Sequence, residues 1–224
     1  MSSYLELSSA KLREFEGCVN WMYRDTAGKV TVGVGLMLPS AAAACALPFL
    51  LDSKPAHPQQ IAEEFARVSA LAPGRLPSFY KTAASPELTD DAVDATLLAV
   101  LTEFDATLRG KIAGYDKLPD GVKLALLDMI YNLGPTGLLT GYPRMLAAIE
   151  GGAWADAAKE CAREGIGAAR NAWARQNLLS GVVDSIRAEL GIDAAAEPEP
   201  PQPKPERWFS RVMRELNKPM FRKK

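Results

Sequence analysis

A change of sequence period within residues 15–36, FEGCVNWMYRDTAGKVTVGVGL, constrains the fold more than any other feature of the chain. Four apolar residues up to this point have roughly helical spacing: Leu5, Leu7, Leu12 and Phe15. Gly17 can end that helix. From residue 30 to residue 35, Val alternates with Thr or Gly, which is typical of a strand, and residues 25–28 form a predicted turn before it. The sequence therefore predicts a helix end that faces a small hairpin.

Two carboxylates and a hydroxyl lie at the ends of these elements. Eight residues separate Glu16 from Asp25, and five separate Asp25 from Thr31. A helix end facing a hairpin can bring all three side chains into one cleft, and this set of groups indicates acid/base chemistry on a bond to oxygen. Each residue also has a structural interpretation: Glu16 as a solvated helix-terminal residue, Asp25 as a turn former and Thr31 as an ordinary strand residue.

The segment resembles the active-site motif of the phage-type lysozymes, glycoside hydrolase family 24, whose Glu, Asp and Thr have the same two spacings. The second half of the chain is similar to the family too, at LTDDA (residues 88–92), LALLDMIYNLGPTG (124–137), Arg144 to Leu146 and WADAA (154–158). The resemblance covers roughly residues 5–190, and residues 39–86 are longer than in the smallest relatives. It implies an α+β, mostly helical, lysozyme-like two-lobed fold, with a small β-hairpin lobe and a larger helical lobe.

The resemblance also implies an activity: a muramidase that cleaves the β-1,4 bond between N-acetylmuramic acid and N-acetylglucosamine with inversion, without metal or cofactor. Glu16 is then the general acid, and Asp25 and Thr31 activate the water. Such an enzyme needs roughly 6.5–9.5 Å between its carboxyl groups, which leaves room for that water. Glu16 stays protonated near neutral pH only if it is partly buried, and Phe15 and Trp21 are its expected apolar neighbours.

Alignment with the family places four residues at substrate-contact positions: Met37, Tyr131, Tyr142 and Glu160. Tyr131 is the best physical candidate because sugars stack on flat apolar rings. The alternative for all four is packing in the core or an ordinary surface position. Where many relatives carry a His that serves as a structural ion-pair partner, this chain has Leu36, so the small lobe must be braced differently, and residues 39–86 are the candidate brace.

Helical patterns predict seven helices: residues 8–17, 41–51, 58–71, 89–112, 120–133, 153–163 and 168–190. Strand is predicted only at about residues 22–36. Thr89 supplies N-terminal capping chemistry, while Gly134 and Gly191 are predicted helix stops.

Cysteine and histidine usage argues against a metal centre and a disulfide framework. The three cysteines, Cys18, Cys45 and Cys161, are widely spaced, and His57 is the only histidine. This pattern fits a reducing compartment. Cys18 is close enough to Glu16 in sequence to be considered as a nucleophile, but the only imidazole lies in a Pro-flanked loop, which favours Cys18 as a small buried residue.

Composition divides the chain into a predicted catalytic domain (residues 1–192), a Pro-rich linker (193–205) and a basic amphipathic tail (206–224). The tail carries one apolar face: Trp208, Phe209, Val212, Met213 and Leu216. Residues 197–224 have a net charge of +4 and the rest −5, so the whole chain has no general nucleic-acid footprint. The tail can dock on this chain or a delivery partner, contact an anionic membrane surface, or be disordered.

No signal peptide and no apolar run of about 20 residues are evident, so we expect synthesis in the cytoplasm. An enzyme acting on peptidoglycan glycan strands then reaches the wall by release or by other machinery, as a phage endolysin or a delivered antibacterial effector. Two alternatives from other classes remain: a peptidoglycan-binding module with little turnover, and an adaptor protein that works through its tail.

Overall fold

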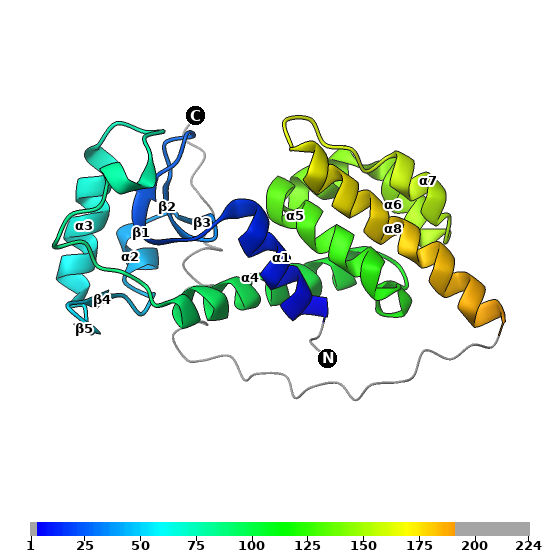
Figure 1. Ribbon diagram of the computed structural model, residues 1–224, viewed down its shortest axis with the longest axis horizontal. Coiled ribbons are helices and arrows are strands. Elements are labelled where there is room, and N and C mark those ends of the chain that lie inside the picture. The colour runs from blue at the N-terminus through cyan, green and yellow to red at the C-terminus, as the bar shows by residue number, and fades with distance from the viewer. Residues whose placement is uncertain (1–3, 191–224) are drawn as a thin grey trace. The chain divides into compact units, whose positions relative to one another are not determined.

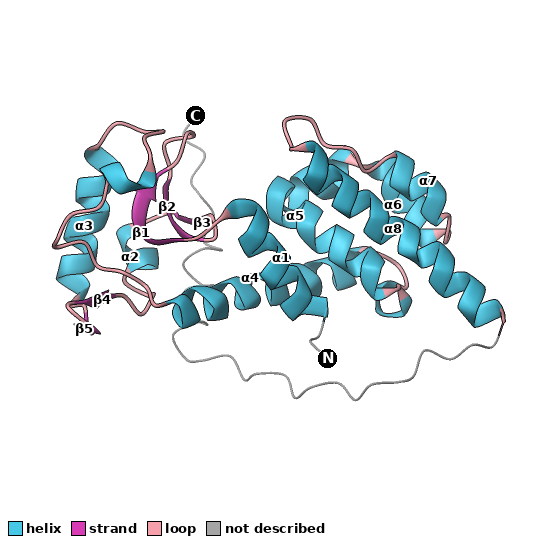
Figure 2. Ribbon diagram, in the orientation of Figure 1, coloured by secondary structure: helices cyan, strands magenta, loops and turns pink. Residues whose placement is uncertain are grey.

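The computed structural model describes residues 4–190, which divide into two compact units. The helical unit comprises residues 4–15 and 101–190, and the sheet unit comprises residues 16–100. The predicted class, α+β and mostly helical, is confirmed (Figure 2). The predicted linker (193–205), the tail (206–224) and the predicted stop at Gly191 lie outside the described residues.

The sheet unit is built around three antiparallel strands in the order β1-β2-β3. These are β1 (Val19–Arg24), β2 (Val30–Gly33) and β3 (Leu36–Leu38). Helix α3 (Pro58–Ala70) contacts β1 and β2, and α2 (Ala41–Ala44) contacts β3 and α3 (Figure 1). The buried side chains of this core include Met22, Val30, Val32, Leu38, Phe49, Ile61, Val68 and Tyr80.

The single helix predicted for residues 41–51 is wrong. Helix α2 ends at Ala44, and β4 (Leu50–Leu51) pairs with β5 (Lys54–Pro55). Pro48 supplies the physical reason, because proline donates no amide hydrogen bond and disfavours helical geometry in the residue before it. Beyond β5, the short 3₁₀ helix η1 (Pro77–Phe79) leads toward α4 (Asp90–Lys111), and the unit boundary falls within α4.

The helical unit contains α1 (Tyr4–Glu16, whose last residue is assigned to the sheet unit), the second half of α4 and η2 (Tyr115–Lys117). Four helices follow: α5 (Asp120–Gly141), α6 (Pro143–Glu150), α7 (Trp154–Lys159) and α8 (Ala168–Glu189). Helix α8 packs against α5 and α7, and α6 packs against α7 (Figure 1). The sequence did not predict α6, and α7 is shorter than the predicted segment.

Several predicted helix ends are confirmed. Gly17 follows α1 with a φ of 72°, a left-handed conformation that glycine adopts without strain. Gly134 has a φ of 70° and interrupts α5, which resumes at Pro135. At the start of α4, the Thr89 hydroxyl accepts a hydrogen bond from the Ala92 amide at 3.1 Å.

Buried Asp105 joins three segments of the helical unit. Its Oδ1 accepts hydrogen bonds from the Tyr4 hydroxyl at 2.8 Å and the Tyr115 hydroxyl at 2.6 Å, and its Oδ2 accepts one from Arg109 at 2.8 Å. Burial, and then the hydrogen bond to Asp105, raise the pKa of both phenols far above that of an exposed tyrosine. This cluster ties α1, α4 and η2 together.

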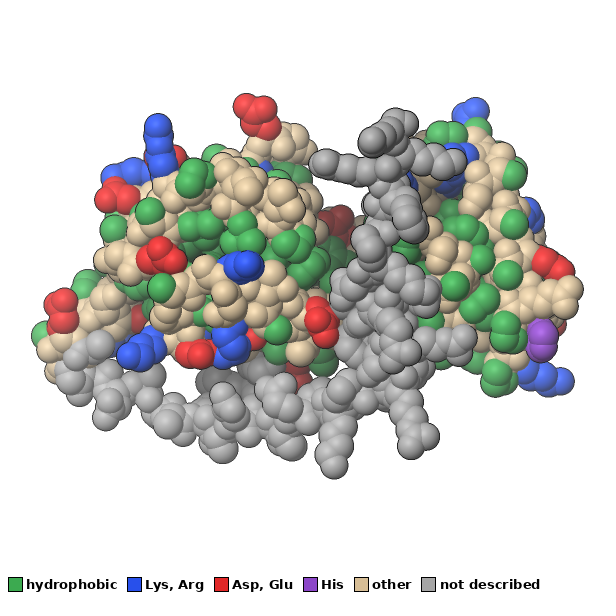
Figure 3. Space-filling model, turned by 180° about the vertical axis from the view of Figure 1, so that it is seen from behind, with side chains coloured by type: hydrophobic (Ala, Val, Ile, Leu, Met, Phe, Trp, Pro, Cys, Tyr) green, Lys and Arg blue, Asp and Glu red, His purple; other side chains and the backbone are tan. Residues whose placement is uncertain are grey.

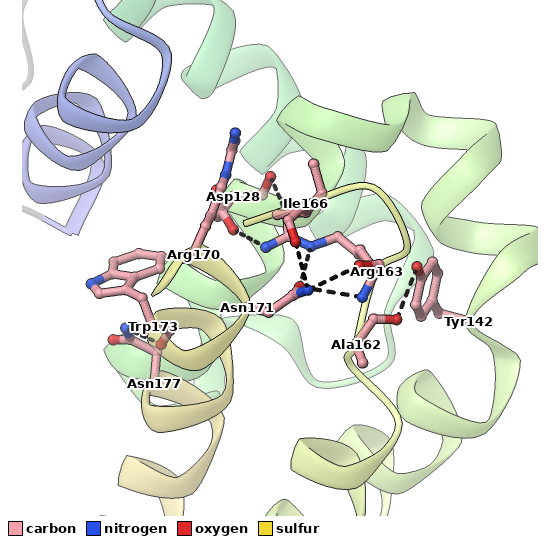
Figure 4. Close-up of polar contacts among 9 residues, drawn as sticks. All are labelled: Asp128, Tyr142, Ala162, Arg163, Ile166, Arg170, Asn171, Trp173 and Asn177. Carbon is pink, nitrogen blue, oxygen red and sulfur yellow. Dashed lines mark hydrogen bonds and ion pairs between the residues drawn. The ribbon is translucent and has the colours of Figure 1, made fainter. Parts of the chain in front are cut away.

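A second buried carboxylate, Asp128 on α5, lies between two arginines (Figure 4). Arg163 Nη2 donates to Asp128 Oδ2 at 2.6 Å, and Arg170 Nε donates to Asp128 Oδ1 at 2.7 Å. The side chains of Asp128 and Arg163 are each 1% exposed. Asn171 joins the group, because its Oδ1 accepts from Arg163 and its Nδ2 donates to the Arg163 carbonyl oxygen. Asp128, Arg163 and Arg170 form the Asp128 triad, and Asn171 supports it. The triad fixes residues 160–167 and the start of α8 onto α5.

We predict that Asp128→Asn lowers the free energy of unfolding by about 3–5 kcal/mol, because Arg163 would stay buried without its carboxylate. Chemical denaturation measures the change. The matched control is Asp184→Asn, because Asp184 faces Arg187 at 3.6 Å with both side chains substantially exposed, and such a pair contributes about 0–1 kcal/mol. Equal effects of the two substitutions would contradict a structural role for the triad.

Candidate functional site

The sheet unit holds the three predicted catalytic residues on the elements that the sequence predicted. Glu16 is the last residue of α1, Asp25 directly follows β1, and Thr31 lies within β2. The short chain path between them, Gly17 and then one hairpin, is the reason that a local stretch of sequence can build this group.

Asp25 is fixed by its own turn. Its amide donates to the Lys29 carbonyl oxygen at 2.9 Å, and its carbonyl oxygen accepts from the Gly28 amide at 3.1 Å. The Lys29 amide in turn donates to Asp25 Oδ1 at 2.6 Å. The turn-forming interpretation of Asp25 is therefore correct, and it is compatible with chemistry: an ionised carboxylate has about four acceptor sites, and this bond orients the group.

Thr31 stands at the centre of a row across the sheet. It is opposite Tyr23 on β1 and opposite Met37 on β3. Directly opposed residues in antiparallel strands place their side chains on the same face, so Tyr23, Thr31 and Met37 share one face. Thr31 is 3% exposed, and its hydroxyl donates to the Lys29 carbonyl oxygen at 3.2 Å, which leaves the oxygen as an acceptor. The predicted contact residue Met37 thus lies beside a predicted catalytic residue.

Tyr23 is the member of this group that the sequence interpretation missed. Burial raises the pKa of its phenol, and the negative charges of Asp25 and then Glu16 raise it further. Both carboxylates therefore lie close enough to act on one hydroxyl. The period of the strand contained the signal, because Tyr23 precedes Asp25 by two residues, the spacing of side chains on one face.

Glu16 departs from expectation in one respect. Its side chain is exposed, whereas the chemistry predicted partial burial beside Phe15 and Trp21. The two aromatic residues are engaged elsewhere. The Phe15 ring packs edge-on against Trp173 at 5.7 Å, and Trp21 Nε1 donates to the Pro77 carbonyl oxygen at 2.9 Å.

The other three predicted substrate contacts belong to the helical unit. The half-buried Tyr131 ring packs edge-on against Phe104 at 6.2 Å. The Tyr142 hydroxyl donates to the Ala162 carbonyl oxygen at 3.4 Å, next to the Asp128 triad (Figure 4). Glu160 is exposed and lies 4.0 Å from Arg144. Tyr142 thus contacts Ala162, two residues beyond Glu160, while Tyr131 lies on α5.

The two residues considered for thiol chemistry have other roles. His57 is exposed, where it is the purple side chain in Figure 3, and its Nδ1 accepts the Gln59 amide at 3.2 Å as the N-cap of α3. Cys18 is half-buried, with its thiol 3.2 Å from Asn20 Oδ1. None of the three cysteines, all of which lie within the described residues, forms a disulfide. Within residues 4–190, no three His, Cys, Asp or Glu side chains gather as a metal site requires.

Comparison with models of known protein families found no match, and comparison with curated proteins found none either. Among the helices of residues 4–190, none has the length and apolar character needed to cross a membrane.

Proposed function

We propose that this chain is a peptidoglycan muramidase of the phage-lysozyme type, cleaving between N-acetylmuramic acid and N-acetylglucosamine. The observation that carries the proposal is the row across the sheet in which Thr31 lies opposite Tyr23 and Met37, beside the turn where the Lys29 amide orients the Asp25 carboxylate at 2.6 Å. Glu16 at the end of α1 and Asp25 on the turn after β1 supply the two carboxyl groups that glycoside hydrolysis requires. Burial, and then the charges of Asp25 and Glu16, raise the pKa of Tyr23, which lies across the strand pair from Thr31. Peptidoglycan glycan strands are the proposed substrate.

In the proposed reaction, Glu16 donates its proton to the glycosidic oxygen as the bond to the anomeric carbon breaks. A water attacks that carbon from the opposite face, and Asp25 takes the water's proton. The bond from the Lys29 amide sets the direction of the Asp25 carboxylate. The Thr31 hydroxyl, donating to the Lys29 carbonyl oxygen, presents its lone pairs as an acceptor for the same water. Inversion at the anomeric carbon follows from the single displacement.

The exposure of Glu16 favours a second candidate, a peptidoglycan-binding module with little turnover. A general acid must hold its proton near neutral pH, and burial is the usual means. For a hydrolase, the bound glycan has to supply the cover that Glu16 lacks in the free protein. The adaptor alternative depends on the tail, which lies outside the described residues.

We predict that Glu16→Gln lowers the release of reducing ends from purified peptidoglycan by about 10²–10⁴-fold, because the amide cannot donate the proton. Glu14→Gln is the matched control: Glu14 lies on the same helix, is 66% exposed and pairs with Lys11 at 2.8 Å. It should keep wild-type activity.

Mass spectrometry of the digest identifies the bond that is cut. Reducing muramic acid ends support the proposal, and products of amide cleavage would contradict it. If wild type and Glu16→Gln bind peptidoglycan equally and both release negligible reducing ends, the binding module is the correct assignment.

A second prediction tests the convergence of the carboxylates without any measurement of activity. Removing a negative charge near Tyr23 stabilises its phenolate, so Asp25→Asn and Glu16→Gln should each lower the pKa of Tyr23, with the larger effect from Asp25→Asn. Spectroscopic titration of tyrosinate, with the same variants carrying Tyr23→Phe subtracted, gives the Tyr23 component. Glu14→Gln should leave it unchanged, and no shift in either carboxylate variant would place the two groups apart.

A further inference from the structure

The turn that carries Asp25 is bonded to a distant stretch of the sheet unit, residues 71–80. The Gly74 amide lies 3.1 Å from the Asp25 carbonyl oxygen and 3.3 Å from that of Arg24, and it donates to both. The Arg24 side chain makes two further bonds: its Nη1 donates to the Leu71 carbonyl oxygen at 2.6 Å, and its Nε donates to the Gly28 carbonyl oxygen at 2.9 Å. The planar guanidinium thereby joins the two sides of the turn to residues 71–80.

The buried phenol of Tyr80 adds hydrogen bonds to the same network. Tyr80 is 0% exposed, and its hydroxyl lies 2.7 Å from the Ala72 carbonyl oxygen and 3.0 Å from the Arg24 carbonyl oxygen. It also accepts the Arg75 amide at 3.3 Å. A single buried hydroxyl is therefore hydrogen-bonded to the backbone of both residues 71–80 and the Asp25 turn.

Residues 71–80 are also attached to α3, through the carbonyl group of Tyr80. Buried Glu64 on α3 binds Arg67 through both oxygens, at 2.6 and 2.8 Å, and accepts the Ser85 hydroxyl at 2.6 Å. Arg67 also donates to the Tyr80 carbonyl oxygen. The stretch is thus fixed at Tyr80 to α3, a helix that packs on β1 and β2, in addition to its bonds with the Asp25 turn.

We propose that residues 71–80 are a brace that positions Asp25 for catalysis, with Tyr80 and Arg24 as its positioning residues. The inference rests on the proposed function, in which Asp25 directs the water. The brace acts on the backbone of residues 24–28, and the Lys29 amide carries that geometry to the Asp25 carboxylate. A displacement of about 1 Å at a reacting group is sufficient to cost about 10²-fold in rate.

The test compares Tyr80→Phe with Tyr115→Phe in the full chain. Both substitutions remove one hydroxyl from a tyrosine that is at most 2% exposed and hydrogen-bonded, one in each unit. We expect both to lower the Tm by similar amounts. Only Tyr80→Phe should lower kcat, by about 10–100-fold, with KM changed by less than about threefold, because the substrate contacts themselves remain.

Amide hydrogen exchange gives a readout that does not depend on activity. Tyr80→Phe should accelerate exchange at Gly28 and Lys29 by about 10-fold, and Tyr115→Phe should leave these amides unchanged. Arg24→Lys, which keeps the charge but cannot reach two carbonyl groups in one plane, should reproduce both effects of Tyr80→Phe.

The outcomes separate the two proposals. A wild-type protein without muramidase activity overturns the proposed function and the catalytic role of the brace with it. An active wild type with unchanged kcat in Tyr80→Phe and Arg24→Lys overturns the brace alone, as does unchanged exchange at Gly28 and Lys29. Loss of kcat together with faster exchange in both variants, absent from Tyr115→Phe, supports it.

Discussion

The helical unit depends on one buried group of charges, the Asp128 triad. Taking an ion out of water costs several kcal/mol even in a relaxed protein interior, so each member requires the others. Asp128 lies 35 and 42 residues from its two arginines, and the group forms only when α5, residues 160–167 and α8 have come together. Arg170 also covers the Phe15 ring at 5.3 Å. Phe15, the residue before Glu16, is therefore in contact with an ion cluster whose members are far apart in the sequence.

The carboxylates of the chain fall into two physical classes. Asp105, Asp128 and Glu64 are buried, and hydrogen-bond donors from several segments satisfy them, as a low-dielectric interior demands. Asp25 and Glu16 are more accessible, and Asp25 is oriented by a single backbone amide. A carboxylate that is to exchange protons with a substrate needs such accessibility. Burial thus separates the carboxylates that hold the scaffold from the two proposed for chemistry.

The sequence predicts local features well and long-range contacts poorly, for identifiable reasons. Gly17, Asp25 and Thr31 occupy their predicted settings because turn and strand chemistry is encoded within a few residues. The helix predicted over residues 41–51 is wrong because an apolar run fits helix and strand patterns alike, and Pro48 within it opposes a continuous helix. The contacts of Arg24 and Tyr80 with carbonyl oxygens 47 and 56 residues away leave no periodic trace in the sequence. The two arginines of the Asp128 triad are likewise indistinguishable from surface arginines by spacing alone.

The brace gives a physical meaning to Leu36, at the position where the resemblance to the phage-type lysozymes leads us to expect a structural His. Leu36 is half-buried and lies opposite Val32 between β2 and β3, so the two residues form an apolar pair at that point of the sheet. A His in an ion pair loses its charge once the pH rises past its pKa, which is about 6.5 when unperturbed and higher beside a carboxylate, and a brace built on it weakens accordingly. The guanidinium of Arg24 binds carbonyl oxygens, which do not titrate. A turn held in this way keeps its geometry across neutral pH, so any pH dependence of the proposed hydrolysis has to arise from the groups that exchange protons with the substrate.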